Sequence, residues 1–221
     1  MAWVLLIGPG MEQTLPHAVV PYSPVHLAVA RPDRFTRMQL LVRGAVFIAL
    51  GMVGLSFAGI FGFAYLVLPI YAAVRLGSPE SARAYLDEDR PRILGLLRWF
   101  ASLSAWVGLV ADRLPTRSPD ETVSLTLDEA PTRPTAGSVL ARIVTGLPSA
   151  LVLMVLCSIG VFVWMWAALS ILVSERVGPG AFDYLVGLQR WSVRLLAYQA
   201  GLVDAYPPFA FADARATTAT M

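Results

Sequence analysis

The sequence contains no lysine and no asparagine, and it has one cysteine and two histidines. All 17 basic residues are therefore arginines, and against 15 acidic residues they leave a net charge of only +2. A single cysteine excludes a disulfide framework, and with so few histidines there is no Cys/His set for a metal site. We therefore expect neither a metal nor another cofactor.

Lysine and asparagine are both encoded by AT-rich codons, so their absence indicates a GC-rich bacterial genome and not a functional choice. No basic face with interleaved aromatic residues is present, which argues against nucleic-acid binding. The one cysteine, Cys157, stands in the middle of an apolar run. Such a position predicts a buried, inert thiol.

Charge is scarce: charged residues make up 14% of the chain and hydrophobic residues 57%, whereas about 25% of a soluble domain is charged. Two runs, 44–74 and 143–174, hold 31 and 32 residues without a charge. Each exceeds the ~20 residues that cross a bilayer, so we expect one long spanning helix per run, with tilt or a proline kink absorbing the excess. This predicts a multi-pass protein of the bacterial inner (cytoplasmic) membrane.

The first run carries a small residue at every fourth position, namely Gly54, Ala58 and Gly62. In lipid such a stripe lets another helix approach closely. We expect it to pack against the second span or a partner subunit. The alternative is that glycine is simply frequent in membrane helices.

A five-residue motif follows each run. Gly95-Leu96-Leu97-Arg98-Trp99 and Gly187-Leu188-Gln189-Arg190-Trp191 are 92 positions apart, and at this offset eight of 21 positions are identical. The match predicts an internal duplication. Alternating apolar residues near positions 25 and 123 predict a short surface strand before each run.

The expected fold is an all-α membrane protein of two tandem repeats, each with a long transmembrane helix, an amphipathic helix and a short surface β segment. The expected ranges are an N-terminal extension at 1–20, repeat 1 at 21–118 (span 44–74, helix 91–113), repeat 2 at 119–212 (span 143–174, helix 183–204), and a flexible tail at 213–221. Whether the amphipathic helices also cross the membrane, giving four spans instead of two, is left open.

The repeated arginine, tryptophan and aspartate are the candidate binding residues. Arginine binds phosphate through two nitrogens, and indole rings anchor at the membrane interface. We expect these side chains to contact anionic lipid headgroups or a partner's acidic edge, although plain interfacial anchoring is the alternative. The two aspartates lie ~21 Å along the helix from the arginines, so they pair between the copies or mark the helix ends. The set is Arg98, Trp99 and Asp112 in repeat 1, and Arg190, Trp191, Arg194, Asp204, Tyr206, Pro207 and Pro208 in repeat 2.

The second copy also carries an F-D-Y-x-x-G-x-x-R-W-x-x-R helix at 182–194 and a D-A-Y-P-P-F tail at 204–209. These motifs resemble a family of bacterial membrane proteins of unknown function. The resemblance covers roughly residues 120–211; the first copy fits only loosely, because Leu114-Pro115-Thr116 stands where the second has Tyr206-Pro207-Pro208. It implies a membrane protein and carries no established activity. The tail itself predicts a rigid stop.

Enzyme signatures are missing from the sequence, which has no phosphate-binding glycine loop, no His-Glu-x-x-His and no nucleophile elbow. The acidic cluster Asp87-Glu88-Asp89 stands among arginines, which predicts a solvated, self-paired face. We therefore expect no enzyme. The leading hypothesis is a non-catalytic membrane scaffold or accessory subunit that binds another membrane protein or itself. The alternative is a lipid-binding or small-solute transport component with its site between the repeats.

Overall fold

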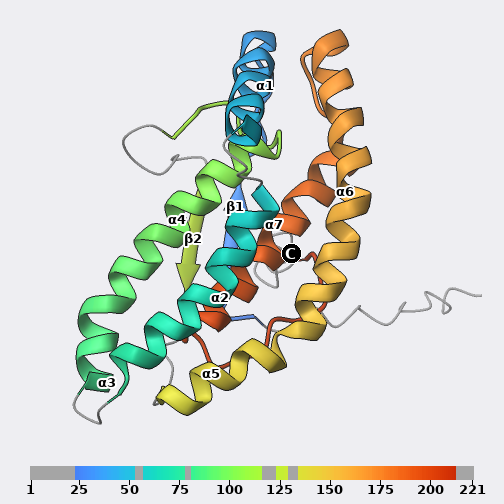
Figure 1. Cartoon of the computed structure of the whole chain (residues 1–221). Coiled ribbons are helices and arrows are strands. Elements are labelled where there is room, and N and C mark those ends of the chain that lie inside the picture. The colour runs from blue at the N-terminus through green and yellow to red at the C-terminus, as the bar shows by residue number, and fades with distance from the viewer. Residues whose placement is uncertain (1–22, 53–56, 78–80, 116–122, 129–133, 213–221) are drawn as a thin grey trace, which may run out of the picture.

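A computed structural model describes residues 23–52, 57–77, 81–115, 123–128 and 134–212 (Figure 1). We call residues 25–115 the first half and residues 123–212 the second half. The first half contains β1 (Val25–Val29), α1 (Arg37–Met52), α2 (Phe57–Arg75), α3 (Ser81–Ala84), a π-helical turn η1 (Tyr85–Asp89) and α4 (Arg90–Val107). The second half contains β2 (Val123–Leu127), α5 (Ala136–Thr145), α6 (Leu147–Ser174) and α7 (Pro179–Gln199).

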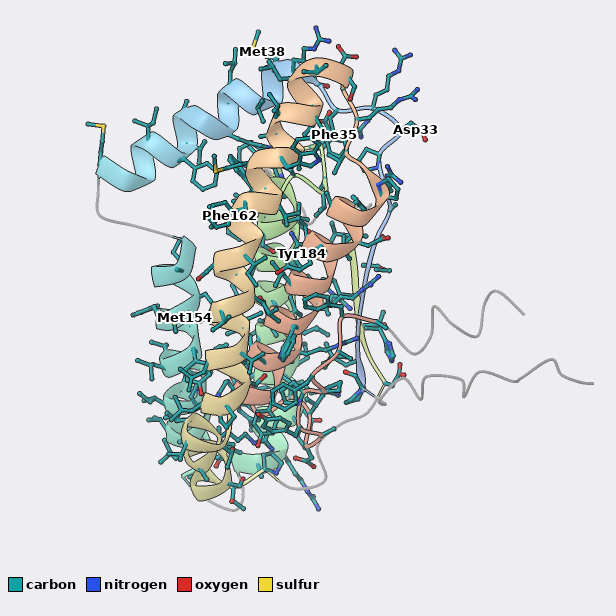
Figure 2. The ribbon with its side chains drawn as sticks, turned by 90° about the vertical axis from the view of Figure 1, so that its right-hand side faces the viewer. Asp33, Phe35, Met38, Met154, Phe162 and Tyr184 are labelled. Atoms are coloured by element: carbon teal, nitrogen blue, oxygen red, sulfur yellow. The ribbon has the colours of Figure 1, made fainter. Side chains whose placement is uncertain are left out.

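The elements stack in three layers. The long helices α2 and α6 lie on one side, α4 and α7 lie in the middle, and the two strands lie on the opposite side (Figure 2). In Figure 1 α2 runs downward from α1 to α3, whereas α6 runs upward from α5, so the two long helices are antiparallel. Helix α7 contacts α6, α4, α2 and β1, and it therefore forms the centre of the hydrophobic core.

The strands pair antiparallel, with Leu27 opposite Leu125, and thus join one strand of each half into a two-stranded ribbon. Val25, Leu27, Val123 and Leu125 are buried against the helices, because alternate side chains of a strand share one face. The surface β segments expected at 25 and 123 are therefore present, and they pair with each other.

Each uncharged run forms two helices, not the single long helix expected. In the second run α5 ends at Thr145 and α6 begins at Leu147. Gly146 stands at this break, and a Cβ there would lie 2.3 Å from Gln199 Nε2 and 2.9 Å from the Tyr65 hydroxyl. In the first run α1 ends at Met52 and α2 begins at Phe57, and residues 53–56 between them lie outside the described part of the chain.

Helices α4 and α7 end in the same way. Leu109 and Gly201, 92 positions apart, both adopt the left-handed conformation, with φ of 62° and 69°. The next residue of each then bonds back to the helix, Val110 N to Ala105 O and Leu202 N to Ala197 O, both at 3.0 Å. These left-handed C-caps end the helices several residues before the expected ends at 113 and 204.

Two helices are long and apolar enough to span a membrane: Ala58–Arg75 within α2, and α6. Only 22% and 17% of their residues are buried inside the structure. The outer face of α6 exposes large apolar side chains such as Phe162, Met165 and Trp166. Cys157 is exposed on this helix as well, so the expectation of a buried thiol is wrong.

Candidate functional site

The arginines of α7 bind the chain's own backbone. Arg194 is 2% exposed; its guanidinium donates to the carbonyl oxygens of Ala210 (2.9 Å) and Ala212 (3.0 Å), and its Nε to that of Val25 (3.4 Å). Arg190 Nε donates to the carbonyl oxygen of Leu27 at 2.9 Å. Together they satisfy the outward carbonyls of β1, which an open sheet edge would otherwise leave unpaired.

Trp191 is buried, being 3% exposed. Its indole Nε1 donates to Ser149 Oγ at 2.7 Å, and its ring stands edge-on to that of Phe209, with centroids 5.4 Å apart. The expectation that Trp191 lies at the boundary between acyl chains and water is therefore wrong. Its helix is covered by α6, α4 and the ribbon, so α7 is a core helix whose two arginines face β1 and the C-terminal segment.

The first half uses the motif differently. Arg98 Nε donates to the carbonyl oxygen of Leu125 at 3.1 Å, so each half's arginine binds the other half's strand. Arg98 is nevertheless exposed, and Trp99 is 45% exposed. Interfacial anchoring by Arg98 and Trp99 stays a prediction.

The two aspartates pair with the arginines that immediately precede the uncharged runs, Asp112 with Arg43 and Asp204 with Arg142. Arg142 of α5 donates to Asp204 Oδ1 at 2.9 Å and to the carbonyl oxygen of Val203 at 2.6 Å, with its guanidinium 4.7 Å from the ring centre of Tyr198. Asp204 therefore does not pair with a motif arginine of the other copy.

Arg43 of α1 forms the matching group in the first half. It donates to the carbonyl oxygen of Ala111, lies 4.0 Å from Asp112 Oδ1, and stands 5.2 Å from the ring centre of Trp106. Burial lowers the pKa of Arg43 to about 10 against the opposing effect of Asp112, so the guanidinium stays charged at neutral pH. Asp112 also accepts hydrogen bonds from the backbone and hydroxyl of Thr36.

The C-terminal tail packs along α7. Tyr206 stands edge-on to Tyr198 with ring centroids 5.6 Å apart, Pro207 is buried, and the carbonyl oxygen of Pro208 accepts from Ala210 N at 2.8 Å. The tail then brings Phe211 onto Gly187, where a Cβ would lie 2.5 Å from the ring. This close approach explains glycine at this position in the second copy of the motif.

The small-residue stripe does not pack within the described part of the chain. Ala58 is exposed, and a Cβ on Gly62 would meet no described atom within 4 Å. Gly54 lies outside the described residues. Of the two contacts expected for the stripe, the one with the second span is not formed by Ala58 or Gly62, and a contact with a partner stays a prediction.

The acidic cluster is self-paired, but only part of it is solvated. Asp87 and Glu88 are exposed, whereas Asp89 is 1% exposed and accepts from Arg75 Nε at 2.7 Å and from the Tyr71 hydroxyl at 3.0 Å. Burial opposes ionisation of Asp89, but the hydrogen bonds from Arg75 and Tyr71 outweigh it and hold the pKa of the carboxyl below its usual value.

Within the described residues no group of three or more His, Cys, Asp or Glu side chains could hold a metal ion. Among the described residues, the structure gathers three arginine–aspartate–aromatic groups, around Arg43, Arg75 and Arg142, and the arginines that bind the ribbon. Arg43 and Arg142 were missed as site residues, although one available signal was that each immediately precedes an uncharged run.

Comparison with known proteins assigns part of the second half. No curated protein and no solved structure matches the chain. The model of one domain family matches residues 137–210, from α5 to the tail. Residues 137–210 are thus a domain of unknown function, DUF4389.

Proposed function

We propose that this protein is a non-catalytic integral membrane scaffold or accessory subunit of a larger bacterial membrane complex. The observation that carries this proposal is the outer surface of α6. This 28-residue helix has only 17% of its residues buried, and its exposed apolar side chains include Met154, Val161, Phe162, Trp166 and Val173.

Such a surface is not compatible with water on both sides of the helix. Leaving one large apolar side chain exposed instead of buried costs about 1.5–3 kcal/mol, and contiguous apolar patches mark lipid or protein contacts. A buried core helix of a soluble protein is mostly covered, which α2 and α6 are not. Both therefore span the inner membrane in this proposal, in opposite directions, and the remaining exposed faces contact lipid or a partner.

The polar side chains support a structural role. Arg43, Arg142 and Arg194 are buried and bind backbone carbonyls that hold helix ends, the ribbon and the tail together. Groups committed to such bonds are not available as acids, bases or nucleophiles for a substrate.

We also propose that the two halves are tandem repeats. Several pairs of equivalent contacts support this. The left-handed residues Leu109 and Gly201 end α4 and α7 alike. Arg43 and Arg142 bind carbonyl oxygens 92 positions apart, those of Ala111 and Val203 respectively. The motif arginines bind opposite strands, as described for Arg98 and Arg190.

Site-specific photo-crosslinking tests the scaffold. The full chain would carry benzoylphenylalanine at Met154 of α6, which is 61% exposed, or at Leu96 of α4, which is 67% exposed and serves as the matched control. We expect a discrete protein adduct from position 154 and a partner that co-purifies stoichiometrically in mild detergent. Adducts with lipid alone at position 154, without a co-purifying protein, would count against the scaffold.

The alternative function, lipid or small-solute binding between the halves, is favoured by one observation. A hollow lined by arginines lies between the loop before α1, in the first half, and the end of α6, in the second half.

A further inference from the structure

The hollow at the C-terminal end of α6 has a volume of about 280 Å³. Three of its lining residues are arginines and one is a glutamate, so the lining carries an excess of positive charge. The residues are Arg34, Arg37, Val173, Ser174, Glu175 and Arg176.

The chain fixes the two sides of this hollow against each other. Phe35, 1% exposed, anchors the loop before α1, and its backbone N–H donates to the carbonyl oxygen of Glu175 at 2.8 Å. Arg31 of the same loop donates to the carbonyl oxygen of Val177. Figure 2 shows Phe35 and Met38 beside the upper end of α6. These bonds hold the backbone that carries Arg34 close to the backbone that carries Arg176, although the two arginines are distant in sequence.

The charges within the hollow are not balanced. Glu175 pairs with Arg37, whose Nε lies 3.3 Å from Glu175 Oε1. Arg34 and Arg176 are exposed, and within the described residues neither guanidinium group makes a hydrogen bond; Arg176 contributes only its backbone carbonyl, which accepts from the Ser174 hydroxyl. Two guanidinium groups are therefore available to an anion, and the arginine fork matches phosphate oxygens.

An apolar groove begins just beyond the hollow. It has a volume of about 620 Å³ and runs between α6 and the first turns of α7, where it is lined by Phe162, Val163, Trp166, Gly178, Gly180 and Tyr184, among others. In Figure 2 Tyr184 lies between α6 and α7, below the level of Phe35. Only the turn after α6 separates the arginines from this groove, because Arg176 lines one and Gly178 the other.

We propose that the hollow and the groove together bind one anionic phospholipid. Arg34 and Arg176 hold its phosphate, and an acyl chain lies in the groove against Phe162 and Trp166. The inference rests on the proposed membrane location. If α6 crosses the membrane, its ~42 Å length exceeds the ~30 Å hydrocarbon core, so its C-terminal end reaches the headgroup level. An arginine there is attracted to anionic lipid.

The test uses the full chain purified in mild detergent, with phosphatidylglycerol or phosphatidylcholine added and bound lipid counted by native mass spectrometry. We expect the wild type to retain phosphatidylglycerol in preference to phosphatidylcholine. The variant Arg34→Gln/Arg176→Gln should weaken phosphatidylglycerol retention roughly tenfold to thirtyfold. The charge-matched control Arg83→Gln/Arg92→Gln, near the opposite end of the molecule, should bind as the wild type does.

A second variant tests the groove. A Cβ on Gly180 would meet no described atom within 4 Å, so Gly180→Leu places a side chain in the groove without a clash. We expect it to reduce retention of both lipids, because it occupies the position of the acyl chain. Retention equal to that of the wild type would remove the groove from the proposal.

Three results would overturn the lipid site. These are equal retention of the two lipids by the wild type, unchanged phosphatidylglycerol retention by Arg34→Gln/Arg176→Gln, and displacement of the lipid by an equal concentration of free glycerol 3-phosphate, which would indicate a site for soluble phosphate. Carbonate extraction of the full chain from membranes tests the proposed location separately. A chain that resists extraction and yet fails the lipid test refutes the lipid site alone.

Discussion

The two halves end in helices of related sequence, yet α7 is enclosed and α4 is not. On α7, Gly187 and Trp191 are buried under Phe211, Phe209 and Ser149. At the equivalent positions of α4, Gly95 and Trp99 are exposed. The motif is the same in both helices, so the difference comes from what covers it: α6 and the C-terminal tail cover α7.

This contrast shows what the motif does in the second half. Its glycine admits a ring of the tail, its tryptophan bonds to the start of α6, and its arginines bind β1 and the tail. The residues are used to assemble the domain from three separate segments. In the first half the same residue types are left at the surface, where only Arg98 keeps its bond to the opposite strand.

The largest difference between the halves should appear at the two tryptophans. Trp191→Ala removes a buried ring and the donor to Ser149 Oγ, so we expect a loss of about 3–5 kcal/mol. Trp99→Ala should cost about 1 kcal/mol or less, because the ring is half exposed. Denaturant unfolding of the purified full chain in mild detergent would measure both. Equal losses would mean that α4 is covered as fully as α7, contrary to the structure.

The second-largest difference between the halves should be the loss of stability when a motif arginine is replaced. Arg194→Met removes the buried guanidinium that donates to the carbonyl oxygens of Ala210 and Ala212 and, beside the Ser23 hydroxyl, to that of Val25, which we expect to cost about 3 kcal/mol. Arg98→Met loses one bond at an exposed site and should cost about 1 kcal/mol or less. The same unfolding measurement applies. A small effect of Arg194→Met would show that water can replace the guanidinium at the edge of β1.

Much of the architecture could be predicted from residue patterns. Uncharged runs located the long apolar helices, alternation located both strands, and the offset of 92 matched two helices that end alike. A proline kink was expected in the runs, and Pro148 stands in the first turn of α6, just after the break at Gly146. The contacts that require glycine at this break could not be predicted, because Gln199 and Tyr65, which approach its backbone, are distant in sequence. Nothing in the local sequence reveals such a contact.

The site residues show a similar limit. The environment of Arg190, Trp191 and Arg194 was misjudged, because an arginine four residues from another looks like the polar face of an amphipathic helix. Arg194 faces backbone carbonyls instead of water, and these belong to β1 and the tail. The partners of Asp112 and Asp204 were missed for the related reason that Arg43 and Arg142 come from other helices.

Replacing the two motif glycines by alanine should change the free energy of unfolding in opposite directions. In Gly187→Ala the new Cβ would lie 2.5 Å from the Phe211 ring, and we expect a loss of about 1–3 kcal/mol as the tail is displaced. At Gly95 no described atom lies within 4 Å of a Cβ, so Gly95→Ala should stabilise α4 by about 0.5–1 kcal/mol through helix propensity. Thermal unfolding of both variants would measure the difference. Destabilisation by Gly95→Ala would reveal a contact on α4 that the structure does not contain.

The smallest expected effect is a pH dependence confined to the first half. Since the pKa of Asp89 is lowered in the folded state, its pairing with Arg75 and Tyr71 stabilises the fold above the ordinary carboxyl value of 3.8. That contribution is lost as the pH falls through the lower folded pKa. We therefore expect Asp89→Asn to melt at a lower temperature than the wild type at pH 7. The gap should narrow below about pH 4, where the wild-type carboxyl also becomes neutral. A gap that stays constant down to pH 3 would mean that the ionised form of Asp89 contributes nothing, and that its hydrogen bonds alone secure the turn before α4.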